Sequence, residues 1–433
     1  MKLQLISPRS MLALESTKWF IASALLFRVI LEVGYHVFVS PVFGYDGFVL
    51  DIDYLKYFES WLIWFFLVAI FPKILLKASD YLMGFLLFSF LTPLLALYGL
   101  SNLNREHLYF VLLGVLMISL FRIGRPIKLP LIRHGRALVF IIAALSAVVV
   151  TVWLIMSSGM NNFNINFLRV YEYRREVGEL INQGWMGYIV TWVTKVFGPI
   201  LLAFFLWKKN LWGVFLIFSL HLFWFGMTSH KAVLLYPFLV TFLWFWFRLS
   251  KALALIPIIF ATLVLLSFLL YLVIDDIWLG SLFIRRVFFV PPFLTFTYYE
   301  FFTLNEFVFW SSSITSLFID YPYELDPAKE IGVYMGAEGV HANASFLATG
   351  YMHAGIPGII FYGIFVGLLF RLIDSLSVKG VPPWVGVASI IIPMQSLITS
   401  ADLPTALLTH GVGLSIIILF LLRSAGRCTA NPK

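Results

Sequence analysis

Basic side chains gather in three segments that lie between or beside the apolar runs of the chain. They are the stretch "FLRVYEYRREVGELINQG", the short turn "SHK" and the pair at the centre of "LFIRRVFF". Guanidinium forks bind phosphate oxygens in pairs, so this composition predicts a site for an anion such as a pyrophosphate. The candidate binding residues are Arg169, Arg174, Arg175, His230, Lys231, Arg285 and Arg286.

A second set of candidates lies in "GVYMGAEGVHANASFLATGYMHAGIPG", residues 332–358. Glu338 and His341 precede an apolar run, and a carboxylate or an imidazole is the usual type of general base. Asn343 or Ser345 could cap the helix that follows, and the free N–H groups at its start would favour an anion. His353 falls inside the apolar run, where we expect a core hydrogen bond.

Three ionisable residues fall within apolar runs that are long enough to cross a membrane. Arg28 and Glu32 are four residues apart on one helix face, so we expect them to neutralise each other. Lys195 lies near the middle of its run, too far from either end for its stem to reach water. An ionisable group at such a depth predicts a cavity or pathway, and Lys195 is therefore a further candidate binding residue.

Each candidate has a simpler interpretation. Arg175 could pair with Glu172 and Glu179 on its own helix, and Arg285 with Arg286 could anchor to lipid headgroups. His341 could be an ordinary loop histidine.

The sequence predicts neither a metal site nor a cofactor. Asp275-Asp276 is interpreted as the polar end of a span. The single cysteine, Cys428, excludes an internal disulfide and a cysteine-rich metal site.

The composition defines the elements that must position these residues. Of the 433 residues, 61% are hydrophobic and 12% are charged, with a mean hydropathy of +0.94, whereas soluble domains carry about 25% charge. Apolar runs near 20 residues recur along the chain, which predicts an all-α polytopic membrane protein. We expect about twelve spans, at residues 19–39, 60–77, 81–100, 107–121, 137–158, 186–207, 211–228, 232–247, 252–274, 350–370, 384–399 and 407–422.

An even number of spans places both termini on one side, and the connections on that side hold most of the Lys and Arg residues, which predicts a cytoplasmic location. The net charge of +8 is explained by this asymmetry and does not indicate nucleic acid. The opposite face receives residues 159–185, the turn at 229–231 and the long stretch 275–349. Pro291-Pro292 interrupts the apolar part of that stretch, so we expect an interfacial or re-entrant helix there.

These features together resemble the Wzy-type bacterial polymerases of O-antigen and capsule repeat units. The "SHK" turn and "HANASFLATGYMHAGIPG" are similar to blocks of that family, as are two arginine-rich periplasmic loops, 159–185 and 275–349. The family has an arginine and a glycine with ten residues between them, and the chain departs from this pattern, since nine residues lie between Arg174 and Gly184. The departure bears on the role of each arginine more than on the family.

The resemblance implies a GT-C-like glycosyltransferase of the bacterial inner membrane that needs no metal. It would join oligosaccharide repeat units carried on undecaprenyl pyrophosphate in an inverting displacement at the periplasmic face. The arginines, with His230, Lys231, Lys195 and Asn343, would bind substrate, and His341, with Glu338, would take the acceptor proton. Membrane lipids and a chain-length regulator are the other expected partners.

Three alternatives remain open at the level of sequence. An O-antigen ligase shares the architecture and the donor but transfers glycan to lipid A core. A lipid-linked oligosaccharide flippase or another transporter predicts short loops on both faces, internal repeats and cations inside the bundle. A non-enzymatic assembly subunit needs neither Lys195 nor the arginines.

Overall fold

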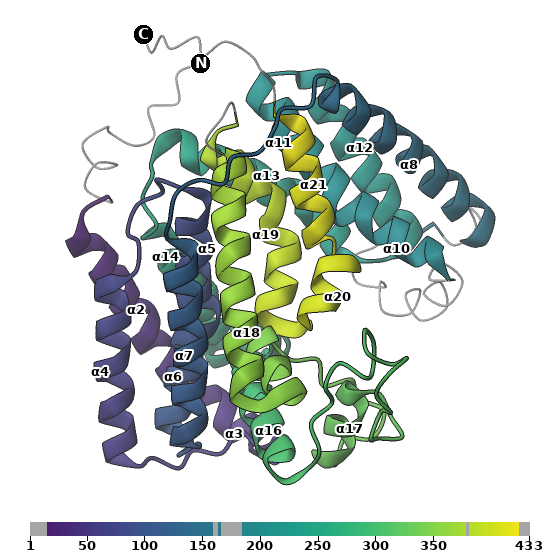
Figure 1. Ribbon diagram of the computed structural model, residues 1–433. Coiled ribbons are helices and arrows are strands. Elements are labelled where there is room, and N and C mark those ends of the chain that lie inside the picture. The colour runs from purple at the N-terminus through teal and green to yellow at the C-terminus, as the bar shows by residue number, and fades with distance from the viewer. Residues whose placement is uncertain (1–14, 159–162, 166–183, 378–380, 424–433) are drawn as a thin grey trace. The chain divides into compact units, whose positions relative to one another are not determined.

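The computed structural model describes residues 15–158, 163–165, 184–377 and 381–423 (Figure 1). The fold is all-helical, with 77% helix and no strand in the part described. Within it, eleven helices are long and apolar enough to cross a membrane. The predicted all-α polytopic membrane architecture is therefore confirmed.

Contacts divide the chain into two compact units, which are described separately. Unit 1 comprises Met1–Gly124, Ser250–Phe370 and Leu397–Leu403, and unit 2 comprises Arg125–Leu249, Arg371–Ser396 and Pro404–Lys433. Unit 1 contains α2 (Thr17–Gly34), η1 (Tyr35–Val39), α3 (Ser40–Phe43), η2 (Gly44–Asp46), α4 (Tyr54–Ile70), α5 (Ala78–Leu86), η3 (Leu87–Leu91), α6 (Thr92–Leu100), α7 (Arg105–Arg122), α14 (Leu255–Ile274), α15 (Ile277–Gly280), η6 (Ser281–Phe289), α16 (Val290–Leu304), α17 (Pro327–Tyr334) and most of α18 (Phe346–Ser377). Unit 2 contains α8 (Gly135–Ser158), α10 (Trp185–Trp192), η5 (Val193–Phe197), α11 (Gly198–Lys208), α12 (Leu211–Thr228), α13 (Lys231–Leu249), most of α19 (Pro383–Ser400) and of α20 (Leu403–Leu408), and α21 (Val412–Leu422).

Two predicted spans differ from the helices observed. The run expected at 60–77 is the helix α4, Tyr54–Ile70, which begins earlier because the Asp53 carboxylate accepts the backbone N–H groups of Leu55 and Lys56 at 2.8 and 3.1 Å. It has 17 residues, and α7 has 18 but carries three charged groups, so neither is among the eleven helices. The last predicted span, 407–422, is broken between α20 and α21.

Side-chain caps begin several helices and explain where the apolar runs become helical. Asn104 accepts the His107 N–H at 3.0 Å at the start of α7, and Asn210 accepts the Gly213 N–H at 3.1 Å at the start of α12. The Asp276 carboxylate accepts two N–H groups at the start of α15. An Asn or Asp oxygen satisfies donors that the first helical turn leaves free.

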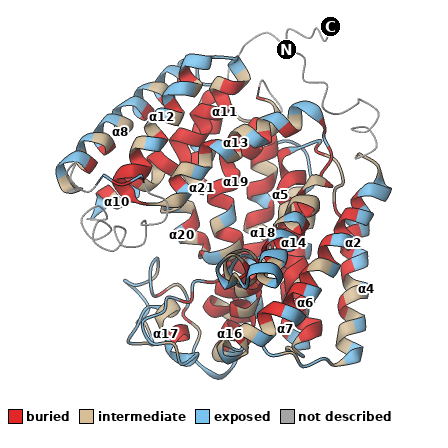
Figure 2. Ribbon diagram, turned by 180° about the vertical axis from the view of Figure 1, so that it is seen from behind, coloured by how far each residue is buried: buried red, intermediate tan, exposed pale blue. Residues whose placement is uncertain are grey.

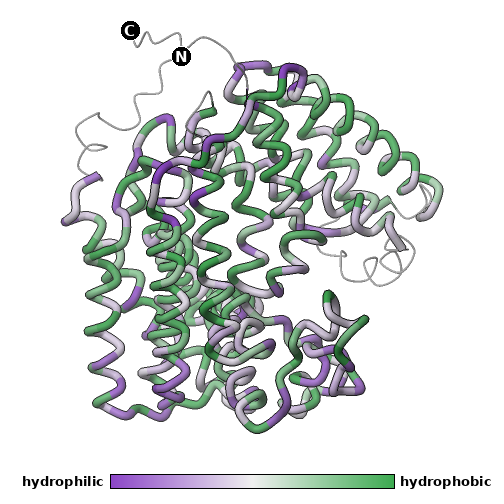
Figure 3. Tube along the Cα trace, in the orientation of Figure 1, coloured by the Kyte–Doolittle hydropathy of each residue, from purple (hydrophilic) through white to green (hydrophobic). Residues whose placement is uncertain are grey.

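Burial varies widely among the spans within each unit (Figure 2). In unit 1, 94% of the most apolar 18 residues of the span Ala78–Leu100 are buried, so this span forms the core. In unit 2, only 22% of the most apolar 18 residues of α8 are buried, although α8 is more apolar than Ala78–Leu100. Green, the apolar colour, predominates along α8 in Figure 3, which is the pattern of a helix that faces lipid.

The helix Ile277–Leu304, formed by α15, η6 and α16, was expected to be interfacial or re-entrant. Near its start, Gly280 packs on the Phe38 ring close to the end of the first span. Near its end, the Tyr299 hydroxyl donates to Glu106 at 2.9 Å, at the beginning of α7. These two places lie at the same end of unit 1. Tyr35, near Phe38 in the first span, donates to the Val49 carbonyl and shares a hydrogen bond with Ser101. Ser101 lies just before α7, so the end of the first span is next to the beginning of α7.

The helix is therefore long enough to cross a membrane, yet it begins and ends at one end of the unit 1 helices. Figure 1 shows α16 at the end of the unit where α3 lies. This placement agrees with the interfacial or re-entrant prediction.

Arg28 is completely buried in the first span, and every nitrogen of its guanidinium has a partner. Its Nε donates to Glu32 at 2.6 Å, Nη1 to the Thr92 carbonyl at 2.8 Å and Nη2 to the Ser60 hydroxyl at 3.0 Å. The second Glu32 oxygen accepts the Tyr57 hydroxyl at 2.8 Å. The predicted pairing of Arg28 with Glu32 is confirmed, and the pair joins three spans of unit 1.

Candidate functional site

A cavity of about 800 Å³ lies at the end of unit 1 that α16 crosses, and residues of unit 1 alone line it. It brings together residues that are far apart in the sequence, from the end of the first span, from η6 and α16, and from the segment that follows α17. The lining residues that can carry charge or act as a base are Asp46, Arg285, Arg286, Glu300 and His341. The predicted convergence of Arg285, Arg286 and His341 is therefore present.

Arg285 is mostly buried and holds a carboxylate that is distant in sequence. Its Nη1 donates to Asp46 at 2.6 Å, and its guanidinium carbon lies 4.2 Å from the centre of the Phe43 ring. Its Nε is buried and has no hydrogen-bond partner in the described part of the chain. The Arg285 guanidinium is thus fixed in place, but its buried Nε–H remains unused.

Arg286 follows immediately and differs in its surroundings. It is exposed, lines the cavity, and has no hydrogen-bond or ion-pair partner among the described residues. Glu300, on α16, and His341 are exposed lining residues as well. An unpaired guanidinium, a carboxylate and an imidazole around one hollow can bind an anion and remove a proton from a neighbouring hydroxyl.

Aromatic rings form much of the remaining wall. They are Tyr45, Phe48, Phe293, Phe296 and Tyr334. The backbone beyond α17 bends at Gly336 and Gly339, which have φ of 73° and 83°; only glycine adopts this region without strain. The bend turns the chain so that Ala337, Val340 and His341 face the cavity.

Two predicted site residues lie close in sequence but do not line this cavity. Glu338 and Asn343 are exposed, and neither is among the lining residues. Ser345, not Asn343, caps α18, with its hydroxyl 3.4 Å from the Ala348 N–H and its carbonyl 3.0 Å from the Thr349 N–H. Glu300, which no sequence pattern identified, takes the place expected for Glu338.

The other predicted residues belong to unit 2 or lie outside the described residues. Arg169, Arg174 and Arg175 are outside the described part, so their role stays a prediction. His230 and Lys231 stand at the turn between α12 and α13, where Ser229 has a φ of 52°. Lys195 lies in η5, with its Nζ 3.4 Å from Nδ1 of His410.

His353 takes part in a closed hydrogen-bond network in unit 1. Its Nε2 is 3.0 Å from Oδ2 of Asp402, whose Oδ1 accepts the Tyr362 hydroxyl at 2.8 Å. The Trp310 indole N–H donates to the Tyr362 oxygen at 2.7 Å, and its backbone N–H donates to His353 Nδ1 at 3.1 Å. Since Nδ1 accepts, the ring proton is on Nε2. The expected core hydrogen bond of His353 is confirmed.

Asp402 was not recognised from the sequence. Burial alone would raise the pKa of its carboxyl, but hydrogen bonds from His353 and Tyr362 outweigh burial and hold the pKa below its usual range. The only sequence signal is a single acidic residue between two apolar runs, which does not identify its partner.

This network fastens the segment that follows α16 to a kink in α18. Gly355 has a φ of 62°, and Pro357 has no N–H to offer the His353 carbonyl four residues earlier. The backbone N–H groups of Val308 and Phe309 donate instead to the carbonyls of Met352 and His353, both at 3.0 Å. We call residues 308–311 the strap.

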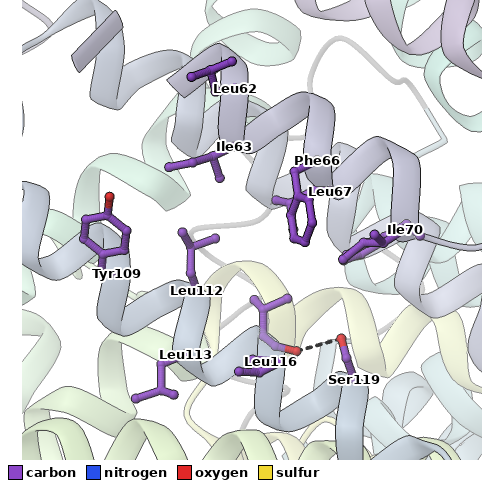
Figure 4. Close-up of a pocket in the computed structure, with 12 residues that line it drawn as sticks. Leu62, Ile63, Phe66, Leu67, Ile70, Tyr109, Leu112, Leu113, Leu116 and Ser119 are labelled. Carbon is purple, nitrogen blue, oxygen red and sulfur yellow. Dashed lines mark hydrogen bonds between the residues drawn. The ribbon is translucent and has the colours of Figure 1, made fainter. Parts of the chain in front are cut away.

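A second hollow, of about 600 Å³, lies between α4 and α7 of unit 1 and is almost entirely apolar. Figure 4 shows two rows of side chains, one from each helix, facing across it. Phe66 and Leu116 of its lining are exposed, as expected where lipid chains contact a membrane protein. Its only titratable side chain is Tyr109, so it offers a surface for hydrocarbon and no acid–base chemistry.

The chain matches no protein-family model, and no curated protein or solved structure matches it.

Proposed function

We propose that the protein is a glycosyltransferase that joins lipid-linked oligosaccharide repeat units, with the unit 1 cavity as its active site. The observation that carries this proposal is the convergence of Arg285, Arg286 and His341 on one hollow with aromatic walls. An anion and a sugar need these groups: guanidinium for phosphate oxygens, aromatic faces for sugar rings, and a base for a hydroxyl.

In the proposed reaction, a hydroxyl oxygen of the acceptor repeat unit attacks the anomeric carbon of the donor sugar. The bond from that carbon to the carrier pyrophosphate breaks, and the pyrophosphate leaves with its electron pair. Arg286 and the free Nε of Arg285 stabilise the negative charge that develops on it. His341 takes the proton of the attacking hydroxyl, and Glu300 is the second group in the cavity able to do so.

The membrane setting supports a carrier with a hydrocarbon chain. The cavity lies at one end of long apolar helices, and the hollow between α4 and α7 is open to lipid on the same unit. A substrate with a polar head and an isoprenoid tail would use both kinds of surface. The proposed location is the bacterial inner membrane, with the cavity on the periplasmic face.

The decisive experiment gives the purified protein a defined undecaprenyl-pyrophosphate-linked repeat unit, without nucleotide. We expect a ladder of dimers and longer products on a gel or by mass spectrometry. Arg286→Ala should remove the ladder while the protein still elutes as a folded species. Arg105→Ala is the matched control, because Arg105 is an exposed arginine of unit 1, paired with Glu59 at 2.9 Å, that does not line the cavity.

Two outcomes would contradict the proposal. A normal ladder from Arg286→Ala and His341→Ala would remove the cavity from the reaction. Transfer of glycan to lipid A core, without any lengthening of the carrier-linked chain, would assign the protein as a ligase.

A further inference from the structure

Lys195 is an ammonium group in the middle of an apolar span of unit 2. The span Trp185–Lys208 has 24 residues, and Lys195 is ten residues from its first one. That is about 15 Å along the axis at 1.5 Å per residue, farther than a lysine stem extends. The group must therefore find its partners inside the unit.

The neighbour that the structure gives Lys195 is another base. Its Nζ lies 3.4 Å from Nδ1 of His410. No carboxylate of the described residues forms an ion pair with either group. This contact is a long hydrogen bond, in which the ammonium donates to the neutral ring. If the ring is protonated as well, the two cations repel each other, and an anion that contacts both groups from one side would offset that repulsion.

The backbone around the pair is irregular on both sides. Lys195 is the central residue of the π-helix η5, a form that is frequently found at functional sites. His410 lies in the break between α20 and α21, beside Gly411, whose φ is 87°. The Trp192 indole donates to the Leu408 carbonyl at 2.8 Å and so fixes the break against α10. Broken helices at membrane depth are found where they line a binding site.

Ser415, in the first turn of α21, provides an independent observation. It is completely buried, and its hydroxyl has no hydrogen-bond partner within the described part of the chain. Thr194, Thr241 and Ser389 of the same unit donate to the carbonyl four residues earlier. The Ser415 hydroxyl makes no such bond. The helix that carries it, α21, packs on η5, where Lys195 lies. A buried hydroxyl of this kind has a donor available for a bound group.

We propose that Lys195, His410 and Ser415 bind a phosphate or pyrophosphate group within unit 2. The Lys195 ammonium, an imidazole N–H of His410 and the Ser415 hydroxyl donate to its oxygens. The negative charge of the anion balances the positive charge of the protonated groups. The group could belong to a lipid headgroup or to a free phosphate, and the chemistry of recognition is the same. This inference does not rest on the glycosyltransferase proposal, since it concerns binding and not turnover.

The test measures binding by the purified full-length protein in two arms. One arm titrates inorganic pyrophosphate, and the other compares phosphatidylcholine nanodiscs with and without dioleoyl phosphatidate by native mass spectrometry. Lys195→Met and His410→Asn should weaken binding about tenfold in at least one arm, the loss expected for one charge-assisted contact. Lys195→Arg should retain most of the affinity. Ser415→Ala should have a smaller effect of the same sign.

Lys208→Met is the matched control, because Lys208 is an exposed lysine at the end of the same span. Arg286→Ala, compared in parallel, reports any anion held in the unit 1 cavity. A loss seen in Lys195→Met but not in Lys208→Met supports the inference, and the arm in which it appears identifies a lipid or a free source. Wild-type affinity of Lys195→Met and His410→Asn in both arms, or no binding by the wild type, would overturn it.

Discussion

Arg28 and Arg285 both lie in apolar helices of unit 1, and each has a carboxylate oxygen 2.6 Å away. Their surroundings differ in what is left unused. Arg28 is inaccessible to solvent, and the Thr92 carbonyl and Ser60 hydroxyl take up its remaining nitrogens. Arg285 borders a cavity, has a buried Nε without a partner, and is followed by the unpaired Arg286.

The difference shows how a structural cation is distinguished from a binding one. An ion pair by itself is uninformative, because both arginines have one. What distinguishes them is whether every donor is satisfied and whether a hollow lies beside those that are not. By this criterion Arg28 holds helices together, whereas Arg285 and Arg286 are candidates for the proposed anion site.

The largest effect is expected at Arg28, the arginine whose donors are all satisfied. Arg28→Met leaves Glu32 buried without its cation, which should cost about 3–5 kcal/mol of stability. We expect little folded protein in fluorescence-detected size-exclusion chromatography. The double substitution Arg28→Met/Glu32→Gln should recover part of the yield, since it removes the stranded charge. A stable single variant would show that the network does not hold the helices.

The role of the arginines that line the cavity is tested by Arg286→Ala. Loss of a donor that stabilises developing charge lowers turnover by about 10²–10³-fold, whereas the melting temperature should stay close to that of the wild type. Turnover of the lipid-linked substrate and thermal unfolding would be measured on the same preparation. Arg285→Lys sharpens the test, because lysine keeps the charge but loses the fork; full activity from it would contradict a role for the fork.

A smaller effect is expected from Asp402→Asn, which weakens the network that holds the strap. Loss of its hydrogen bonds with His353 and Tyr362 should cost about 1–3 kcal/mol. Hydrogen exchange should rise in residues 308–311. The low pKa of Asp402 means that its stabilisation is complete at neutral pH and is lost as acid protonates the folded form. Unchanged exchange would show that the backbone bonds alone hold the strap.

The smallest effect separates the two roles of Arg285. Asp46 is partly exposed, so its ion pair should contribute less than about 1 kcal/mol. Asp46→Asn should therefore leave the melting temperature nearly unchanged but free a second Arg285 donor for ligand. We expect tighter binding of inorganic pyrophosphate, measured by calorimetry. Weaker binding would indicate that Asp46 positions Arg285 and does not compete with the anion.

Much of the fold followed from local sequence patterns. Apolar runs predicted the helices, and the four-residue spacing of Arg28 and Glu32 predicted their pairing. Pro291-Pro292, with two arginines just before them, predicted an interfacial or re-entrant helix, and the observed helix begins and ends at one end of unit 1. Such features depend on neighbours within a few residues, which a sequence displays directly.

The site was predicted only in part, because its partners are distant in the chain. Arg285 binds Asp46, 239 positions away, and His353 binds Asp402, 49 positions away. Neither acid stands in a pattern that identifies its partner. Glu300 stands in no sequence pattern that marks it as a site residue. Glu338 was the predicted partner of His341 because the two are close in the sequence. Only the packing of α16 decided between them.

The kink at Gly355 and Pro357 has a consequence for protein engineering. The broken helix takes hydrogen bonds from a turn more than forty residues earlier in sequence, so neither part is complete without the other. A loop exchanged from another protein would have to supply its own N–H groups at the positions of Val308 and Phe309, or else two buried carbonyls would lose their donors. The segment that follows α16 should therefore be transplanted together with α18, and the two should unfold together.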